Sequence, residues 1–277
     1  MRTIVRCAAL AILATGCGAP IDVVPSQSNV ASPPTTEPTE ETDAIEGTFE
    51  VGDGRELYIV CHGEGSPTIV LEAGDESGIE DWSLIAPSLS EVTRTCAYDR
   101  GGIGRSDAVS GCRQLPDLVA NLESLLAAAE VPGPYVLVAA SGGGFIATGF
   151  AVTRPDEIVG VVFAEVPKAF LDAPPEIVEL TSCDNPANIE HRDYLQVEAD
   201  AWDAREEIGD IPVIIVSNDY GPDGPEASNV FDQQGWLVLS PRAEQIVVES
   251  GHDVTTNEPQ VVTDAVLEVV YAARAGD

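Results

Sequence analysis

The residue of this sequence best suited to chemistry is a serine that precedes three glycines. Ser141 is followed by Gly142-Gly143-Gly144. Residues 135–140 are a short apolar run typical of a buried strand, and residues 145–152 have the composition of a helix. A sharp turn from strand to helix forces its central residue into a strained backbone conformation and exposes the side chain. The pattern predicts a nucleophile at Ser141.

Small residues flank this serine at the spacing that such a turn requires. The usual signature is G-x-S-x-G, and this chain has A-x-S-x-G, with Ala139 and Gly143 in the two small positions. Alanine is nearly as small as glycine, so strand and helix can still approach each other. The same residues also fit a glycine-rich turn without chemistry, and other parts of the chain must separate the two interpretations.

A serine nucleophile needs a base within hydrogen-bond reach, and the base needs a third group to orient it. The chain has three histidines, His62, His191 and His252, as candidate bases. Glu165 ends an apolar strand, where structure alone gives no reason for a carboxylate, so it is a candidate for the third group. No Cys/His spacing resembles a metal site, and the chemistry implies no cofactor.

Residues 134–165 resemble the α/β-hydrolase fold family. The family's elbow is commonly V-G-H-S-x-G-G, followed by a helix and a P-D-x-V-x-G-L-V-L strand; this chain has VAASGGG over 138–144 and RPDEIVGVVF over 154–163. Residues 98–106 also resemble the family's Y-D-x-x-G-x-G-x-S loop, in which we interpret Asp99 and Arg100 as structural. The resemblance extends over residues 47–273.

The resemblance implies roles for specific residues. The family orders its catalytic residues as serine, acid and histidine, and only His252 stands late enough in the chain to be the base. The acid usually follows the strand after the lid, which implies Asp219, with Asp223 as a looser fit. Some members place the acid after the strand that follows the elbow helix, which implies Glu165. Both assignments, Glu165 and Asp219, stay open.

The family's oxyanion hole uses two backbone N–H groups, one after the nucleophile and one in the loop after an early strand. By resemblance these belong to Gly142 and Asp75. The loop reads Ala73-Gly74-Asp75-Glu76, where the family often has His-Gly. An acidic Asp75 side chain would oppose an oxyanion unless it points away.

The expected fold is the α/β-hydrolase fold, with a mostly parallel eight-stranded sheet, helices on both faces and a small helical lid at about 168–211. Strands alternate with helical segments in the order that such a sheet requires. The expected helices include 115–130, 189–207 and 231–239, and another begins at Asp81-Trp82 with Asp81 as its cap. The expected strands are 48–51, 56–61, 68–72, 93–98, 135–140, 158–164, 213–216 and 245–248.

The chain is strongly acidic, with 13 basic and 47 acidic residues, a net charge of −34 and a single lysine at Lys168. Such a surface repels the phosphate backbone of nucleic acids, so nucleic-acid binding is not expected. The excess of acid fits either a saline habitat or simple solubility.

The N-terminus is typical of an exported protein. Residues 1–17 have a charged start, an apolar core and a small-residue run before Cys17, which resembles a bacterial lipobox. The resemblance implies cleavage before Cys17, lipidation of its thiol and a surface lipoprotein anchored in the membrane. An ordinary signal peptide, and so a secreted protein, is the alternative. Residues 18–46 are predicted to be a disordered tether, and 47–277 the hydrolase domain.

Four cysteines remain in the expected domain, and an oxidising compartment favours two disulfides with three possible connectivities. In the resembled fold the strands that hold Cys61 and Cys96 are neighbours, which favours that pair. Cys112 with Cys183 would then tie the core to the lid. Buried free thiols are the alternative.

These expectations together indicate a serine hydrolase that cleaves a small ester or related acyl compound at the cell surface. The runner-up is a catalytically silent lipoprotein of the same fold that binds a ligand or partner. Other Ser-triad chemistry, such as C–C hydrolysis, perhydrolysis or aminopeptidase action, remains a third possibility. An aspartate nucleophile is excluded by the serine at position 141.

Overall fold

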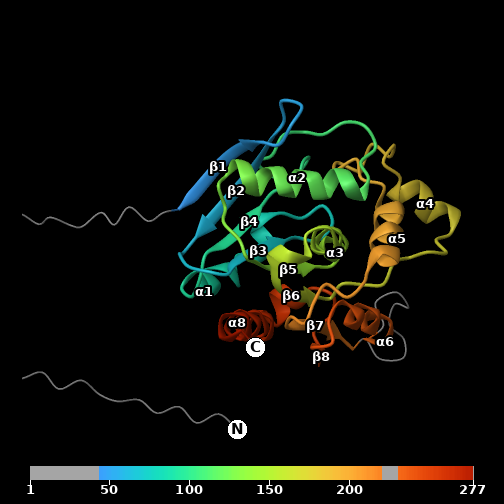
Figure 1. Cartoon of the computed structure of the whole chain (residues 1–277). Helices are drawn as coiled ribbons and strands as arrows, with labels where there is room; N and C mark the ends of the chain where they lie inside the picture. Colours follow the sequence, from blue (N-terminus) through green and yellow to red (C-terminus); the bar gives the residue numbers. More distant parts are fainter. Residues whose placement is uncertain (1–43, 220–229, 277) are drawn as a thin grey trace, which may run out of the picture. The chain divides into compact units, whose positions relative to one another are not determined.

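An eight-stranded sheet forms the centre of the computed structural model (Figure 1). Its strand order is β1-β2-β4-β3-β5-β6-β7-β8. β2 is antiparallel to β1 and β4, and all the other neighbouring pairs are parallel, which confirms the prediction of a mostly parallel sheet. The strands are β1 (Ile45–Glu50), β2 (Glu56–His62), β3 (Thr68–Glu72), β4 (Thr95–Tyr98), β5 (Tyr135–Ala140), β6 (Ile158–Ala164), β7 (Val213–Asn218) and β8 (Ala243–Val248).

The structure describes residues 44–219 and 230–276. The predicted signal peptide, Cys17, most of the predicted tether and Asp223 lie outside these residues. β1 begins at Ile45, two residues before the predicted start of the domain, because Ile45 and Glu46 pair with Cys61 and Val60 of β2. The predicted tether therefore extended two residues too far.

Helices cover both faces of the sheet (Figure 1). The hydrophobic cluster on one face includes α2 (Leu115–Ala128), α3 (Gly143–Thr153) and α5 (Tyr194–Ala204). The cluster on the other face includes α1 (Ala86–Ser90) and α8 (Pro259–Ala275). The short helices are α4 (Pro175–Thr181), α6 (Val230–Gln233) and α7 (Val254–Asn257).

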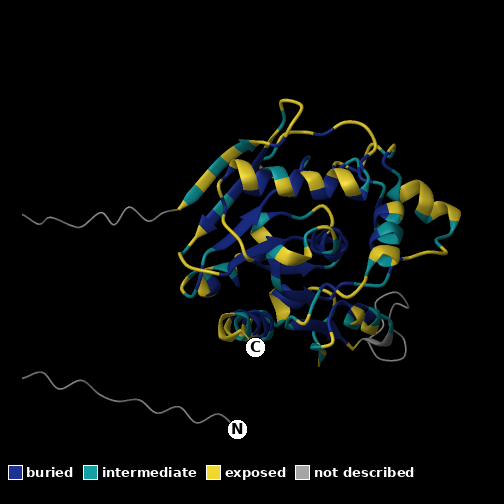
Figure 2. Cartoon of the chain, viewed as in Figure 1, coloured by how far each residue is buried: buried dark blue, intermediate teal, exposed yellow. Residues whose placement is uncertain are grey.

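The central strand β5 shows why a continuous apolar run is needed here. Leu137 and Ala139 belong to the cluster under α2 and α3, whereas Val136 and Val138 belong to the cluster under α8. Successive side chains of a strand point to opposite faces, so a strand covered on both sides is apolar at every position. Figure 2 shows these buried strands between helices whose outer faces are exposed.

The predicted 115–130 helix is α2, which ends two residues early at Ala128, and the other helix predictions differ more. The predicted 189–207 helix is α5, which begins at Tyr194 because Asp193 caps it, its side chain accepting the Gln196 N–H at 3.2 Å. The residues just before it pair instead with Arg113. The predicted 231–239 helix is α6 followed by a 3₁₀ turn, Gln234–Leu239.

The helix predicted to begin at Asp81-Trp82 is also different. The chain there forms a 3₁₀ turn, Ile79–Trp82, and the α-helix α1 begins only at Ala86. Asp81 lies inside the turn and does not cap it. The carboxylate of Asp99 accepts the Ile79 N–H at 3.0 Å. A side chain distant in sequence therefore satisfies a backbone N–H at the start of the turn, as a local cap would.

Two disulfides join the cysteines as the resemblance implied. Cys61 and Cys96 face each other in register on β2 and β4 and are bonded. Cys112 and Cys183 are bonded across 71 residues and fasten the segment between β6 and β7 to the residues before α2. We call residues 168–211 the inserted segment, and it carries α4 and α5.

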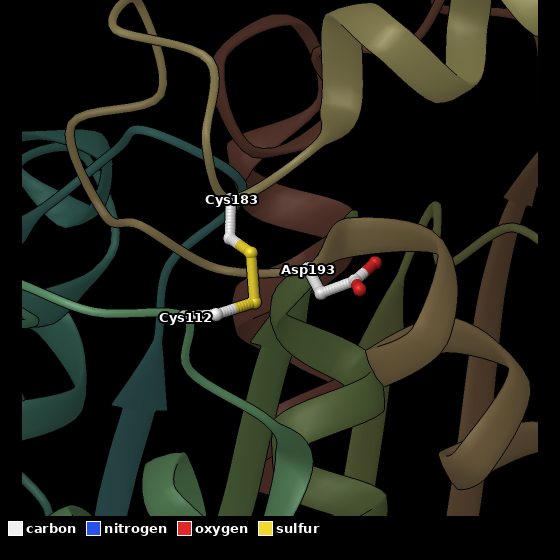
Figure 3. Close-up of side chains that lie close together, drawn as sticks. All are labelled: Cys112, Cys183 and Asp193. Atoms are coloured by element: carbon white, nitrogen blue, oxygen red, sulfur yellow. A yellow bond between two sulfur atoms is a disulfide. The ribbon is translucent and has the colours of Figure 1, made fainter.

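The second disulfide lies beside Asp193 (Figure 3). Cys112, Cys183 and Asp193 form the only group of potential metal ligands that lie together within the described residues. Because the two sulfurs are bonded to each other, they are not available as thiolate ligands. Within residues 44–219 and 230–276, no helix is both long and apolar enough to cross a membrane.

Candidate active site

Ser141 stands where β5 turns into α3, in the conformation that the sequence pattern predicts. Its φ is +47°, in the left-handed region that non-glycine residues seldom adopt. Its N–H donates to the carbonyl of Ala164 at 3.0 Å, and its carbonyl accepts the Gly144 N–H at 3.0 Å. These hydrogen bonds, to the end of β6 and to the first turn of α3, stabilise the strained conformation.

The glycines after Ser141 are needed because other groups pack directly against them. A Cβ at Gly142 would lie 1.8 Å from a carboxylate oxygen of Asp75, and a Cβ at Gly143 would lie 2.3 Å from the carbonyl oxygen of Ala73. Contacts below 3.0 Å leave no room for a side chain at either position. The loop after β3 therefore packs closely against the start of α3.

His252 lies on the loop between β8 and α7, and its Nε2 is 2.9 Å from the hydroxyl oxygen of Ser141. The loop is held by Asn218 at the end of β7. The Asn218 side-chain oxygen accepts the N–H groups of Ser250 at 2.6 Å and Gly251 at 2.7 Å. The histidine ring is half-exposed, so the Ser141–His252 pair is accessible from solvent.

Glu165 is the carboxylate that the structure brings to His252. One carboxylate oxygen, Oε1, is 3.9 Å from His252 Nδ1, a distance for an ion pair but longer than a hydrogen bond. The other, Oε2, accepts the Asn218 N–H at 2.6 Å. Glu165 is 1% exposed, and no hydrogen bond reaches Oε1 from the described residues.

The Glu165 carboxylate changes the titration of the histidine. It raises the pKa of His252 above the usual 6.5, against the opposing effect of burial. The nearby carboxylates of Asp253 and Asp75 act in the same direction. A base facing a buried carboxylate through Nδ1 presents Nε2 to the serine, which is the orientation that proton transfer requires.

The other candidates from the sequence lie at the ends of two strands and in the inserted segment. Asp219 follows β7 and has an exposed side chain. Its N–H donates to the carbonyl of Val248 at 2.8 Å. His62 ends β2 and is exposed. His191 lies in the inserted segment, where its Nδ1 is 3.1 Å from the carbonyl of Cys183. Position at a strand end could not separate Glu165 from Asp219 because both residues follow parallel strands.

The residues of the two predicted oxyanion donors lie next to each other, with the Asp75 carboxylate against Gly142. In the part of the chain that the structure describes, neither the Gly142 N–H nor the Asp75 N–H donates to another protein group. The Asp75 side chain does not point freely into solvent. It forms an ion pair with Arg192 of the inserted segment, and Arg192 is buried.

A buried ionic cluster lies beneath this loop, and the sequence reasoning found only part of it. Arg100 donates to the carbonyls of Ala73 and Gly74 and pairs with Glu72 and Glu190. Burial opposes ionisation of Glu190, but Arg100 outweighs it and lowers the pKa of Glu190 to about 2. The structural interpretation of Arg100 holds, while Glu190 and Arg192 were missed because only the fold brings the inserted segment here.

A cleft of about 390 Å³ opens over the Ser141–His252 pair. Its lining is mainly polar and includes three carboxylates but no lysine or arginine. The lining residues are Gly74, Asp75, Ser77, Asp81, Ala140, Ser141, Ala164, His252, Asp253, Val254 and Thr255. Both members of the pair and the loop after β3 therefore share one solvent-accessible space.

The chain is similar in sequence to several known proteins. No protein-family model matches the chain. A Bacillus subtilis protein, YqjL, described as uncharacterized, is 26% identical over 223 residues, which cover 76% of this chain and 86% of that protein. An AB hydrolase superfamily protein of Gibberella zeae is 29% identical over 103 residues, 36% of this chain and 32% of that protein.

Among solved structures, a thermophilic esterase from Thermogutta terrifontis superposes with a TM-score of 0.67. It is 18% identical in sequence, and the superposition covers 83% of this chain and 98% of the esterase chain. At this identity the likeness concerns the fold. The sheet order, the turn at Ser141 and this superposition agree, and the chain has the α/β-hydrolase fold.

Proposed function

We propose that the protein is a serine hydrolase that cleaves an ester or related acyl bond in a small molecule. The observation that carries the proposal is the 2.9 Å distance between the Ser141 hydroxyl oxygen and His252 Nε2. Serine in a strained turn next to an imidazole is the arrangement that activates a hydroxyl as a nucleophile. The esterase with a similar fold supports the choice of reaction class.

In the first half of the reaction, His252 Nε2 accepts the proton of the Ser141 hydroxyl as the oxygen attacks the substrate carbonyl carbon. Glu165 stabilises the imidazolium that forms. The N–H groups of Gly142 and Asp75 donate to the developing oxyanion. The protonated His252 then gives its proton to the leaving oxygen, and the acyl group stays on Ser141.

In the second half, His252 accepts a proton from water, which attacks the acyl carbon of the acyl-enzyme. The tetrahedral intermediate collapses, His252 returns the proton to the Ser141 oxygen, and the carboxylic acid leaves. Glu165 is our choice for the acid because its buried oxygen faces His252 Nδ1. The same residues can serve other Ser-triad reactions, so the ester class rests on the structural likeness.

A silent binding protein of the same fold is the second candidate, and one observation favours it. The Asp75 carboxylate lies against Gly142, where a negative charge opposes an oxyanion. A set of p-nitrophenyl esters with acyl chains of increasing length separates the two. We expect hydrolysis of at least one ester by the wild type and none by Ser141→Ala. A folded wild type that hydrolyses none of them favours the binding protein.

We also propose that the protein is exported and anchored in the membrane through a lipid on Cys17. The two disulfides support an oxidising compartment, and the lipobox-like sequence supports the anchor. In a bacterial host that processes lipoproteins, we expect labelling by a clickable fatty acid and recovery in the membrane fraction. Cys17→Ser is expected to lose the label; an unlabelled wild type recovered from the medium would favour simple secretion.

A further inference from the structure

Asp75 places a negative charge beside the proposed oxyanion site. Its N–H is one proposed donor, and its carboxylate packs against Gly142, the residue of the other donor. An uncompensated carboxylate at this point would disfavour the negative charge that develops on the substrate oxygen. The proposed reaction therefore needs a group that neutralises Asp75.

Arg192 supplies the opposite charge from the inserted segment. Its Nη2 pairs with the same carboxylate oxygen, Oδ1, that lies nearest to Gly142. Arg192 is 2% exposed, and its guanidinium lies 4.2 Å from the ring centre of Tyr194. Nε and Nη1 of Arg192 have no hydrogen-bond partner within the described residues. Asp75 is therefore the residue with which this buried guanidinium makes its ion pair.

The backbone around Arg192 is fixed on several sides. The Arg113 N–H donates to the carbonyl of His191 at 2.8 Å, and the Asp193 N–H donates to the carbonyl of Arg113 at 3.1 Å. The Asn188 side-chain N–H donates to the carbonyl of Arg192 at 2.7 Å. The Cys112–Cys183 disulfide fastens the same segment next to Arg113. The backbone that carries Arg192 is thus fixed by contacts within the protein.

We infer that Arg192 is a positioning residue for the oxyanion site: it neutralises Asp75 and holds its carboxylate on the side of the inserted segment. The inference rests on the proposed hydrolase function. Arg192 touches no reacting atom, and its effect passes through Asp75. A purely structural ion pair would fasten the inserted segment to the loop without influencing the charge at the reacting centre, and this difference can be tested.

The test compares Arg192→Met, Asp75→Asn and the double variant on the best p-nitrophenyl ester, with circular dichroism as a check of folding. Arg105→Met, which removes an exposed arginine, is the matched control. We expect kcat of Arg192→Met to fall at least about tenfold, with KM changed much less. The double variant should recover kcat to within about threefold of the wild type, because it has no Asp75 charge left to neutralise.

Two outcomes would overturn the inference alone. One is an Arg192→Met variant that is folded and as active as the wild type. The other is a folded double variant that is as slow as Arg192→Met, which would mean that the arginine only supports the fold. A serine-directed fluorophosphonate probe keeps the two proposals apart: if Ser141 of the wild type is not labelled, the hydrolase proposal fails, and this inference fails with it.

Discussion

Glu165 combines two features that are costly for a residue at the end of a buried strand. It has a positive φ of 54°, and its carboxylate is 1% exposed with one oxygen directed at His252. A buried carboxylate without full hydrogen bonding costs free energy of folding, and such costs persist where function requires them. This supports Glu165 over Asp219 as the acid of the proposed triad.

Glu165→Gln and Asp219→Asn test that choice as a matched pair, since each replaces a carboxylate by its amide. We expect kcat of Glu165→Gln to fall at least about 100-fold, because the amide does not stabilise the imidazolium. We expect Asp219→Asn to stay within about threefold of the wild type. Steady-state kinetics with one p-nitrophenyl ester measures both, and the reverse ranking would assign the acid to Asp219.

The pH profile of kcat/KM reports the titration of His252. Because Glu165 raises the pKa of His252 and only the neutral ring accepts the serine proton, activity should fall as pH falls through a value above 6.5. Glu165→Gln should move this limb of the profile to lower pH. An acid limb that stays at the same pH in Glu165→Gln would show that Glu165 does not set the pKa.

The sequence predicts helices and strands best where one short stretch of residues determines the local structure. Strand β5, the turn at Ser141 and helix α3 follow from local apolar pattern and small residues, and all three are present. The acid and the neutralising arginine depend on contacts between distant segments. The 3.9 Å approach of Glu165 to His252 and the pairing of Asp75 with Arg192 join residues 87 and 117 positions apart.

Asn218 illustrates the same limit. Its backbone N–H donates to Glu165, and its side chain accepts two N–H groups from the loop that carries His252. A single residue at the end of β7 thus contacts both the proposed acid and the loop that carries the proposed base. Asparagine after an apolar strand is also common in plain turns, so the sequence alone did not mark Asn218.

The Cys112–Cys183 disulfide fastens the inserted segment, and the double variant Cys112→Ser/Cys183→Ser tests its contribution. Cross-linking a long loop stabilises a fold mainly by restricting the unfolded chain, so we expect a loss of about 2–5 kcal/mol in the free energy of unfolding. Urea unfolding followed by circular dichroism measures this loss.

Cys61→Ser/Cys96→Ser is the matched control for the inserted segment, because that disulfide joins strands that already pair. We compare kcat of the two double variants at a temperature where both are folded. We expect the variant that lacks the Cys112–Cys183 bond to have the lower kcat. Equal kcat values in the two variants would indicate that the bond does not help to position Arg192.

At the scale of the whole molecule, the net charge of −34 is the dominant feature. Repulsion among so many carboxylates destabilises the compact state, and salt screens it. The screening length falls from about 30 Å at 0.01 M to about 3 Å at 1 M ionic strength. We therefore expect Tm to rise with sodium chloride over this range. A Tm that is constant or falls would mean that local ion pairs outweigh the general repulsion.

Covalent labelling shows whether Ser141 is a nucleophile activated by His252. The full-length protein is treated with a fluorophosphonate probe, and the modified residue is located by intact mass and peptide mapping. We expect one label, on Ser141, which is absent in Ser141→Ala and forms much more slowly in His252→Ala. A folded wild type that takes no label, or takes it at another residue, would show that Ser141 is not the nucleophile.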